Sequence, residues 1–72
     1  MIIPKSGKLI FVECPCDDKT YLFLVQFVEK IDGAEGLILF PLLHKTHSWF
    51  YSEARKSYFL AEKCWKYIEK VV

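Results

Sequence analysis

The sequence predicts an α+β fold in which a three-stranded antiparallel β-meander packs against one C-terminal α-helix (β-β-β-α). Three observations lead to this prediction. Three segments rich in β-branched and aromatic residues lie within residues 8–43, turn-forming residues separate them, and the hydrophobic spacing becomes helical after residue 52. The 72 residues are few enough for a single domain, 1–72, and 53% of them are hydrophobic, which argues against disorder.

The first two predicted strands are bounded by residues that favour turns. Lys8–Cys14 follows Gly7 and is followed by Pro15. Thr20–Glu29 is the clearest strand, because it carries apolar side chains at both odd and even positions. A strand with two apolar faces is expected at the centre of a sheet, covered on both sides.

The third predicted strand is Leu37–Leu43, after a connection that contains the turn-forming pair Asp32 and Gly33. Pro41 lies inside this strand and has no N–H to donate to a neighbouring strand. We therefore expect the third strand at an edge of the sheet, or with a bulge, in a meander of order 1-2-3.

The C-terminal segment Ser52–Val71 is predicted to be the helix. Its apolar residues alternate spacings of four and three, which places them on one helix face. The members of this stripe are Ala54, Tyr58, Ala61, Trp65 and Ile68. Ser52 is one candidate N-cap, with Glu53 adding a carboxylate in the first turn, where the helix dipole favours it, and Ser48 is the competing cap.

A single helix covers only one face of the predicted sheet. We expect the aromatic side of the second strand to meet the helix, which leaves Leu22, Leu24 and Val28 as an uncovered apolar patch. The expected aromatic set is Tyr21, Phe23, Val25 and Phe27. Phe59 falls on the charged side of the helix, close to Lys63, and is a second candidate anchor for a partner. These five residues form the predicted protein-binding site.

Composition points to the same class of function. The formal net charge of +1 provides no basic footprint for nucleic acid, and no motif specifies catalysis, so we expect a protein that is not an enzyme and needs no cofactor. We interpret the chain as a non-catalytic protein–protein interaction module. It would act as a homodimer or as a small factor, such as a phage or mobile-element inhibitor, that binds a larger protein.

The main alternative is a small zinc-binding domain. Cys14, Cys16, His44 and His47 offer two thiolates and two imidazoles, the ligand types and number of a tetrahedral zinc site. The same residues could form a thiolate–imidazole pair for catalysis, but a chain this short rarely encloses a substrate pocket. The Cys-x-Cys spacing also differs from the usual zinc knuckle, which has two residues between its cysteines.

A second alternative is a nucleic-acid or chromo-like peptide binder. Trp49, Phe50 and Tyr51 are clustered aromatics of the kind that stack on bases or enclose a methylated cation. The segments 21–27 and 67–70, together with the predicted order of three strands and a helix, resemble chromo and chromo-shadow domains. The resemblance covers about a third of the chain, and the cysteine–proline step that often opens the shadow-domain helix is missing.

The predicted location is the cytoplasm, in a reducing environment. Three cysteines are an odd number, whereas small secreted domains normally pair an even number in disulfides. The N-terminus lacks the charged start and long apolar run of a signal peptide. The longest apolar run, Leu37–Leu43, is far shorter than the roughly 18 residues that span a bilayer, so we expect no membrane partner.

Overall fold

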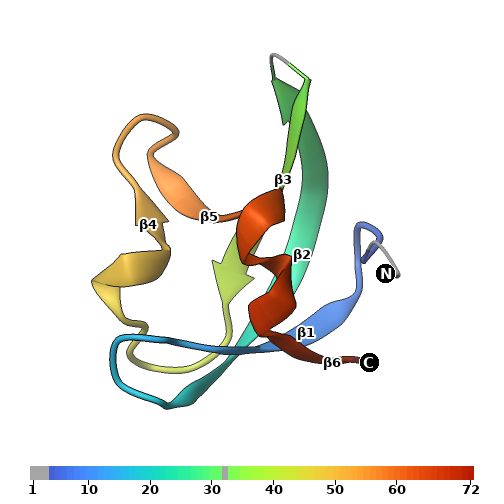
Figure 1. The fold of residues 1–72 in the computed structure, drawn as a ribbon. Helices are drawn as coiled ribbons and strands as arrows, with labels where there is room; N and C mark the ends of the chain where they lie inside the picture. The colour runs from blue at the N-terminus through green and yellow to red at the C-terminus, as the bar shows by residue number, and fades with distance from the viewer. Residues whose placement is uncertain (1–3, 32) are drawn as a thin grey trace.

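A computed structural model describes residues 4–31 and 33–72 (Figure 1). It contains six strands and two short 3-10 helices. In chain order these are β1 (Leu9–Glu13), β2 (Thr20–Ile31), β3 (Ala34–Pro41), η1 (Ser48–Phe50), β4 (Tyr51–Ser52), β5 (Ser57–Ala61), η2 (Glu62–Tyr67) and β6 (Ile68–Val71).

All six strands belong to one antiparallel sheet in the order β4-β5-β3-β2-β1-β6. β1, β2 and β3 pair as neighbours in sequence order, as the predicted meander does, but they form only the middle of the sheet. β5 adds to β3 on one side, and β6 returns from the far end of the chain to pair with β1 on the other. In Figure 1 the β2–β3 hairpin extends away from the body, while η2 passes in front of the sheet.

The hydrophobic core lies on one side of this sheet, which we call the inner face. Every strand except β4 and β6 contributes fully buried side chains to it, and η1 and η2 close it with one aromatic residue each. The members are Ile10, Val12, Cys14, Phe23, Val25, Leu37, Leu39, Phe50, Leu60 and Trp65. Trp65 also donates its indole N–H to the carbonyl oxygen of Leu60 at 3.1 Å, which satisfies its one polar atom.

The predicted C-terminal helix over Ser52–Val71 is wrong, and with it the α+β class. The segment instead forms the end of β4, a turn, β5, η2 and β6. The turn contains Lys56 with φ of +54°, a left-handed conformation that reverses the chain and starts β5. The topological basis for the resemblance to chromo domains disappears with the helix.

Non-local pairing explains why a sheet forms where the spacing suggests a helix. Residues 57–61 also alternate with a period of two, so that Tyr58 and Leu60 point to the core while Phe59 points away from it. As a strand they pair with residues 36–39 of β3 and satisfy its second edge. A helix would leave that edge without partners, which is costly for a buried strand.

β3 is consequently an internal strand, contrary to the predicted edge position. It starts at Ala34 rather than Leu37, because β2 and β3 pair as far as Ile31 and Ala34, leaving only residues 32–33 as the connection. Pro41 is tolerated because it is the last residue of β3 and lies beyond the segment paired with β5.

No helix within the described residues is long and apolar enough to cross a membrane.

Candidate functional site

The side of the sheet opposite the core carries an apolar surface, which we call the outer face. Cross-strand pairing places six large apolar side chains there: Leu9, Phe11, Leu22, Leu24, Phe27 and Phe40. Phe27 and Phe40 have 52% and 51% of their surface exposed, and the other four are partly exposed. Leu42 follows beside Leu22, to which its backbone N–H donates at 3.1 Å, and is 44% exposed.

The outer face contains two of the three strand residues predicted for protein binding. Leu22 and Leu24 lie on it, opposite Phe11 and Leu9 of β1. Val28 does not, because a bulge between Val25 and Phe27 shifts the alternation of β2 by one residue. Val28 is therefore opposite Leu37 on the inner side and is 38% exposed at the end of the sheet.

The same bulge explains why the expected aromatic set does not stay together. Phe23 and Val25 are completely buried in the core as expected, but Phe27, after the bulge, is on the outer face opposite Ile38. Gln26, at the bulge, is exposed. Sequence alternation alone could not reveal this shift, although Gln26 is the one polar residue in the middle of the strand.

Phe59 and Lys63 belong to two different elements, β5 and η2. Phe59 is held in place rather than free: its ring lies against Gly36, where a Cβ atom would come within 2.0 Å of the ring carbon Cζ. The Arg55 guanidinium stacks 3.9 Å from the ring centroid. Lys63 is exposed on η2. The structure makes Phe59 a strand residue that covers a glycine, whereas the sequence suggested an exposed anchor on a helix.

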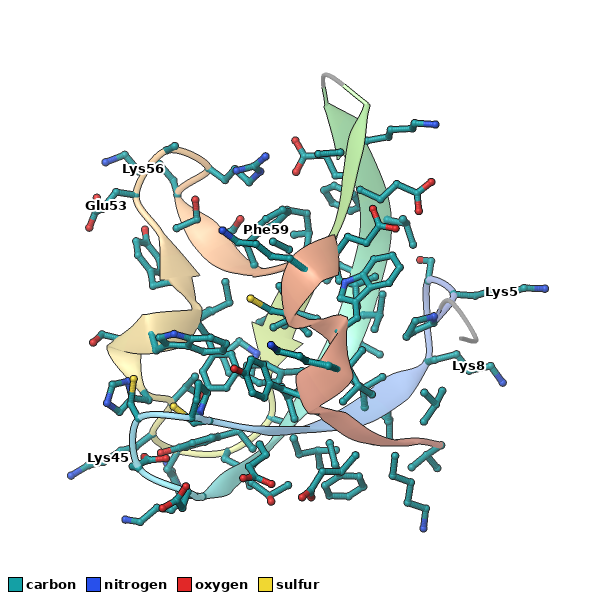
Figure 2. All side chains as sticks on the ribbon, viewed as in Figure 1. Lys5, Lys8, Lys45, Glu53, Lys56 and Phe59 are labelled. Carbon is teal, nitrogen blue, oxygen red and sulfur yellow. The ribbon has the colours of Figure 1, made fainter. Side chains whose placement is uncertain are left out.

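A groove borders the outer face between β2–β3 and the turn that joins β4 to β5. It has a volume of about 540 Å³ and includes Phe27 and Ile38 on its apolar side. Arg55 donates to Glu29 at 3.1 Å across its polar side, with both side chains partly exposed. The charged side chains labelled in Figure 2 are on loops and turns and point outward: Lys5, Lys8, Lys45, Glu53 and Lys56.

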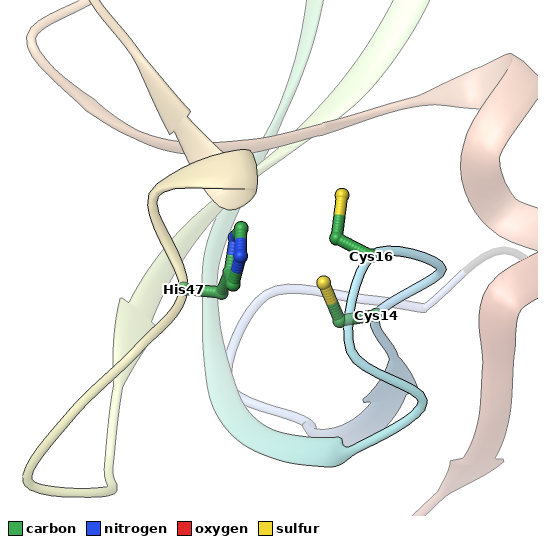
Figure 3. A group of neighbouring side chains, drawn as sticks. All are labelled: Cys14, Cys16 and His47. Carbon is green, nitrogen blue, oxygen red and sulfur yellow. The ribbon is translucent and has the colours of Figure 1, made fainter.

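A second cluster forms at the turn between β1 and β2. The ligand atoms of Cys14, Cys16 and His47 all lie within 4.8 Å of one another. Figure 3 shows the His47 ring facing the two cysteine side chains across the gap between this turn and the loop before η1. Cys14 is buried, His47 is partly buried and Cys16 is exposed, so the cluster opens towards solvent.

The β1–β2 turn fixes the two cysteines through its backbone. Cys14 donates its N–H to the Lys19 carbonyl oxygen at 2.8 Å, and its own carbonyl accepts from Asp18 at 2.9 Å. Asp18 has φ of +56°, which allows the chain to reverse. Burial raises the pKa of the Cys14 thiol, while the N–H groups of Cys16 and Asp17 act on it in the opposite direction.

His47 reaches the cluster because it caps η1. Its Nδ1 accepts a hydrogen bond from the Trp49 backbone N–H at 3.0 Å, which fixes the ring. His44, also predicted as a ligand, is exposed and falls outside the group of close ligand atoms within the described part of the chain. The four-ligand prediction is therefore only partly reproduced in space: three of its members come together.

Two polar neighbours complete the surroundings of this cluster. The Asp17 carboxylate accepts hydrogen bonds from the Tyr21 hydroxyl and, at 3.0 Å, from the Lys19 N–H. The bond from Tyr21 is the main reason why the pKa of Asp17 is lowered, and it raises the pKa of Tyr21 to about 12. Asp17 thus adds a negative charge beside the Cys14 thiol.

Comparison with known proteins identifies no relative of this chain. No protein-family model, no curated protein and no solved structure matches it.

Proposed function

We propose that this chain is a non-catalytic protein–protein interaction module whose outer face docks against a second copy of itself. The observation that carries the proposal is the half-exposure of Phe27 and Phe40 among other large apolar side chains on one side of the sheet. Exposed apolar surfaces of this kind are unusual on monomers and typically mark interaction sites.

The chemistry of the outer face favours a second copy as its occupant. Its six defining side chains are all apolar, and interfaces between identical subunits are more apolar than other interfaces. Two such faces can pack sheet on sheet, with their aromatic side chains interdigitating across a layer about 10 Å thick. The net charge of +1 produces little repulsion between copies.

The size of the molecule is compatible with such a dimer. A specific interface buries about 800 Å² on each partner, which is about one sixth of the 4831 Å² exposed by this chain. The outer face spans β1, β2 and β3, three adjacent internal strands of the sheet. The groove beside Phe27 would receive the edge of the opposing subunit.

Substitution of Phe40 tests the proposal. Phe40→Glu should leave the fold intact, because half of the side chain is exposed, yet it would place a charge in the interface. We expect sedimentation velocity to show a concentration-dependent dimer for the wild type. The variant should weaken dimerisation by at least about thirtyfold, as loss of a binding hot spot of about 2 kcal/mol does.

Val71→Glu provides the matched control. Val71 is 38% exposed, but it is opposite Ile10 and therefore on the inner side of the sheet. The Val71→Glu variant should therefore dimerise like the wild type. A wild-type chain that stays monomeric at millimolar concentration would remove the second copy as the occupant and overturn the proposal, as would equal weakening by both substitutions.

The compartment proposed for this function is a reducing one. All three cysteines are free thiols, and Cys16 is exposed, where an oxidising environment would promote intermolecular disulfides. The cytoplasm provides the conditions under which these thiols persist.

A further inference from the structure

We propose that Cys14, Cys16 and His47 form a zinc-binding site that ties the β1–β2 turn to the loop preceding η1. This site is separate from the outer face and does not depend on it. It rests on three facts: two thiols and one imidazole converge, they come from segments about 30 residues apart in sequence, and each segment is held by backbone hydrogen bonds of its own.

The separations of the ligand atoms are close to those that zinc requires. Zinc–sulfur bonds of about 2.3 Å in a tetrahedral arrangement place two sulfur atoms about 3.8 Å apart. The three ligand atoms are within 4.8 Å of one another, so closure needs movements of about 1 Å or less. Cys16 and His47 can make this movement, because neither is fully buried.

The ligand types select zinc over harder cations. Thiolate and imidazole suit zinc, whereas magnesium and calcium prefer carboxylate and carbonyl oxygens. Binding releases the protons of both thiols, and the resulting thiolates balance the charge of the ion. Three protein ligands leave the fourth position to water on the exposed side, next to Cys16.

A disulfide is a poorer use of the same cysteines. Cys14 and Cys16 are separated by one residue, Pro15, and closing so small a ring would strain the bond. An ion bridges the two sulfur atoms without that strain, because it holds them at non-bonded distance.

Metal binding has a specific consequence for η1. The Nδ1 lone pair of His47 currently accepts the Trp49 N–H. If zinc binds Nδ1 that lone pair is taken, and if zinc binds Nε2 of the neutral ring, Nδ1 carries the proton and cannot accept. Either way the hydrogen bond from Trp49 is lost, so the NMR resonance of the Trp49 backbone amide should shift when the metal binds.

Cobalt provides the probe for the test. The full-length, reduced chain is titrated with Co²⁺, whose thiolate charge-transfer and tetrahedral d–d absorption report sulfur ligation, and the ion is then displaced by Zn²⁺. We expect one Co²⁺ per chain, displaced by one Zn²⁺, and a shift of the Trp49 amide resonance on addition of Zn²⁺.

Two variants assign the ligands without disturbing the fold. Cys16→Ser removes an exposed thiol, and His47→Asn removes the imidazole while keeping a residue that caps helices well. Each should weaken metal binding by more than about a hundredfold, because substitution of a residue that only supports a ligand already costs 10–100-fold. Cys14 is avoided because it is part of the core.

The matched controls are the cysteine and the histidine outside the cluster. Cys64→Ser and His44→Ala should both bind Co²⁺ like the wild type. The proposal is overturned if the wild type gives no thiolate–cobalt absorption, or if Cys16→Ser and His47→Asn retain wild-type affinity. It is also overturned if a control variant loses affinity equally. None of these results bears on dimerisation through the outer face.

Discussion

The contact between Phe59 and Gly36 permits a sharp test of the sheet. A Cβ atom on residue 36 would come within 2.0, 2.3 and 3.0 Å of three ring carbons of Phe59, whereas ordinary contacts are about 3.4–4 Å. Gly36→Ala therefore forces the ring away from β3 and disturbs the Arg55 guanidinium stacked on it. Overpacking of this kind typically costs about 1–3 kcal/mol of unfolding free energy.

The sign should reverse once the ring is removed. Glycine within a strand is less stable than alanine by about 0.5–1 kcal/mol, because it loses more backbone entropy on folding. In a Phe59→Ala background, Gly36→Ala should therefore be neutral or stabilising. The two substitutions are coupled, and we expect an interaction energy of at least about 1.5 kcal/mol.

Urea unfolding followed by tryptophan fluorescence measures this coupling in four proteins: the wild type, the two single variants and the double variant. Equal m-values across the four would show that the shifts in midpoint reflect stability alone. If the effects of Gly36→Ala and Phe59→Ala simply add, the ring does not rest on the glycine. The position of the Phe59 ring across β3 would then be wrong.

Three further predictions follow from individual contacts. Trp65→Ala should cost about 3–5 kcal/mol in urea unfolding, because it removes a large buried side chain from the core, and a cost below 1 kcal/mol would place Trp65 outside the core. The folded-state pKa of Tyr21, about 12, exceeds the ordinary value of 10, so its contribution to stability is complete below pH 10 and is lost as the pH rises towards 12. Tyr21→Phe should remove this step from an alkaline unfolding profile, whereas an unchanged profile would contradict the bond to Asp17. Iodoacetamide should modify the exposed Cys16 in the folded chain much faster than the buried Cys14. Equal rates in mass spectrometry would contradict this difference in exposure.

Local pattern was sufficient to locate β1 and β2 along the chain. β1 and β2 were predicted within two residues at each end, because their apolar residues lie between clear turn signals. The second half depends on non-local pairing. The turn before β5 reverses at Lys56 without a glycine, and the apolar spacing at residues 58, 61, 65 and 68 fits a helix by coincidence. Trp65 was assigned to the core correctly, although it lies on η2 and not on the predicted C-terminal α-helix.

The candidate sites were predictable to a similar degree. Ligand type alone identified Cys14, Cys16 and His47, but no sequence rule distinguishes His47 from His44, since the choice depends on which imidazole caps η1. Leu22 and Leu24 follow from alternation along β2. The contributions of Phe27 and Phe40 to the outer face require the position of the bulge, which depends on how β2 and β3 pair.

The alternation of β1 explains how so short a chain can carry two separate sites. Leu9 and Phe11 point to the outer face, while Ile10 and Val12 point to the core, and Cys14, the residue directly after the strand, continues the inward series. The side chains of β1 and of the residue that follows it therefore serve the proposed dimer interface and the proposed metal site from opposite sides of the sheet. Because the sheet separates them, a dimer can form with the cysteine cluster still open to solvent, and metal can bind without contact with the outer face. Each proposal can consequently fail without weakening the other.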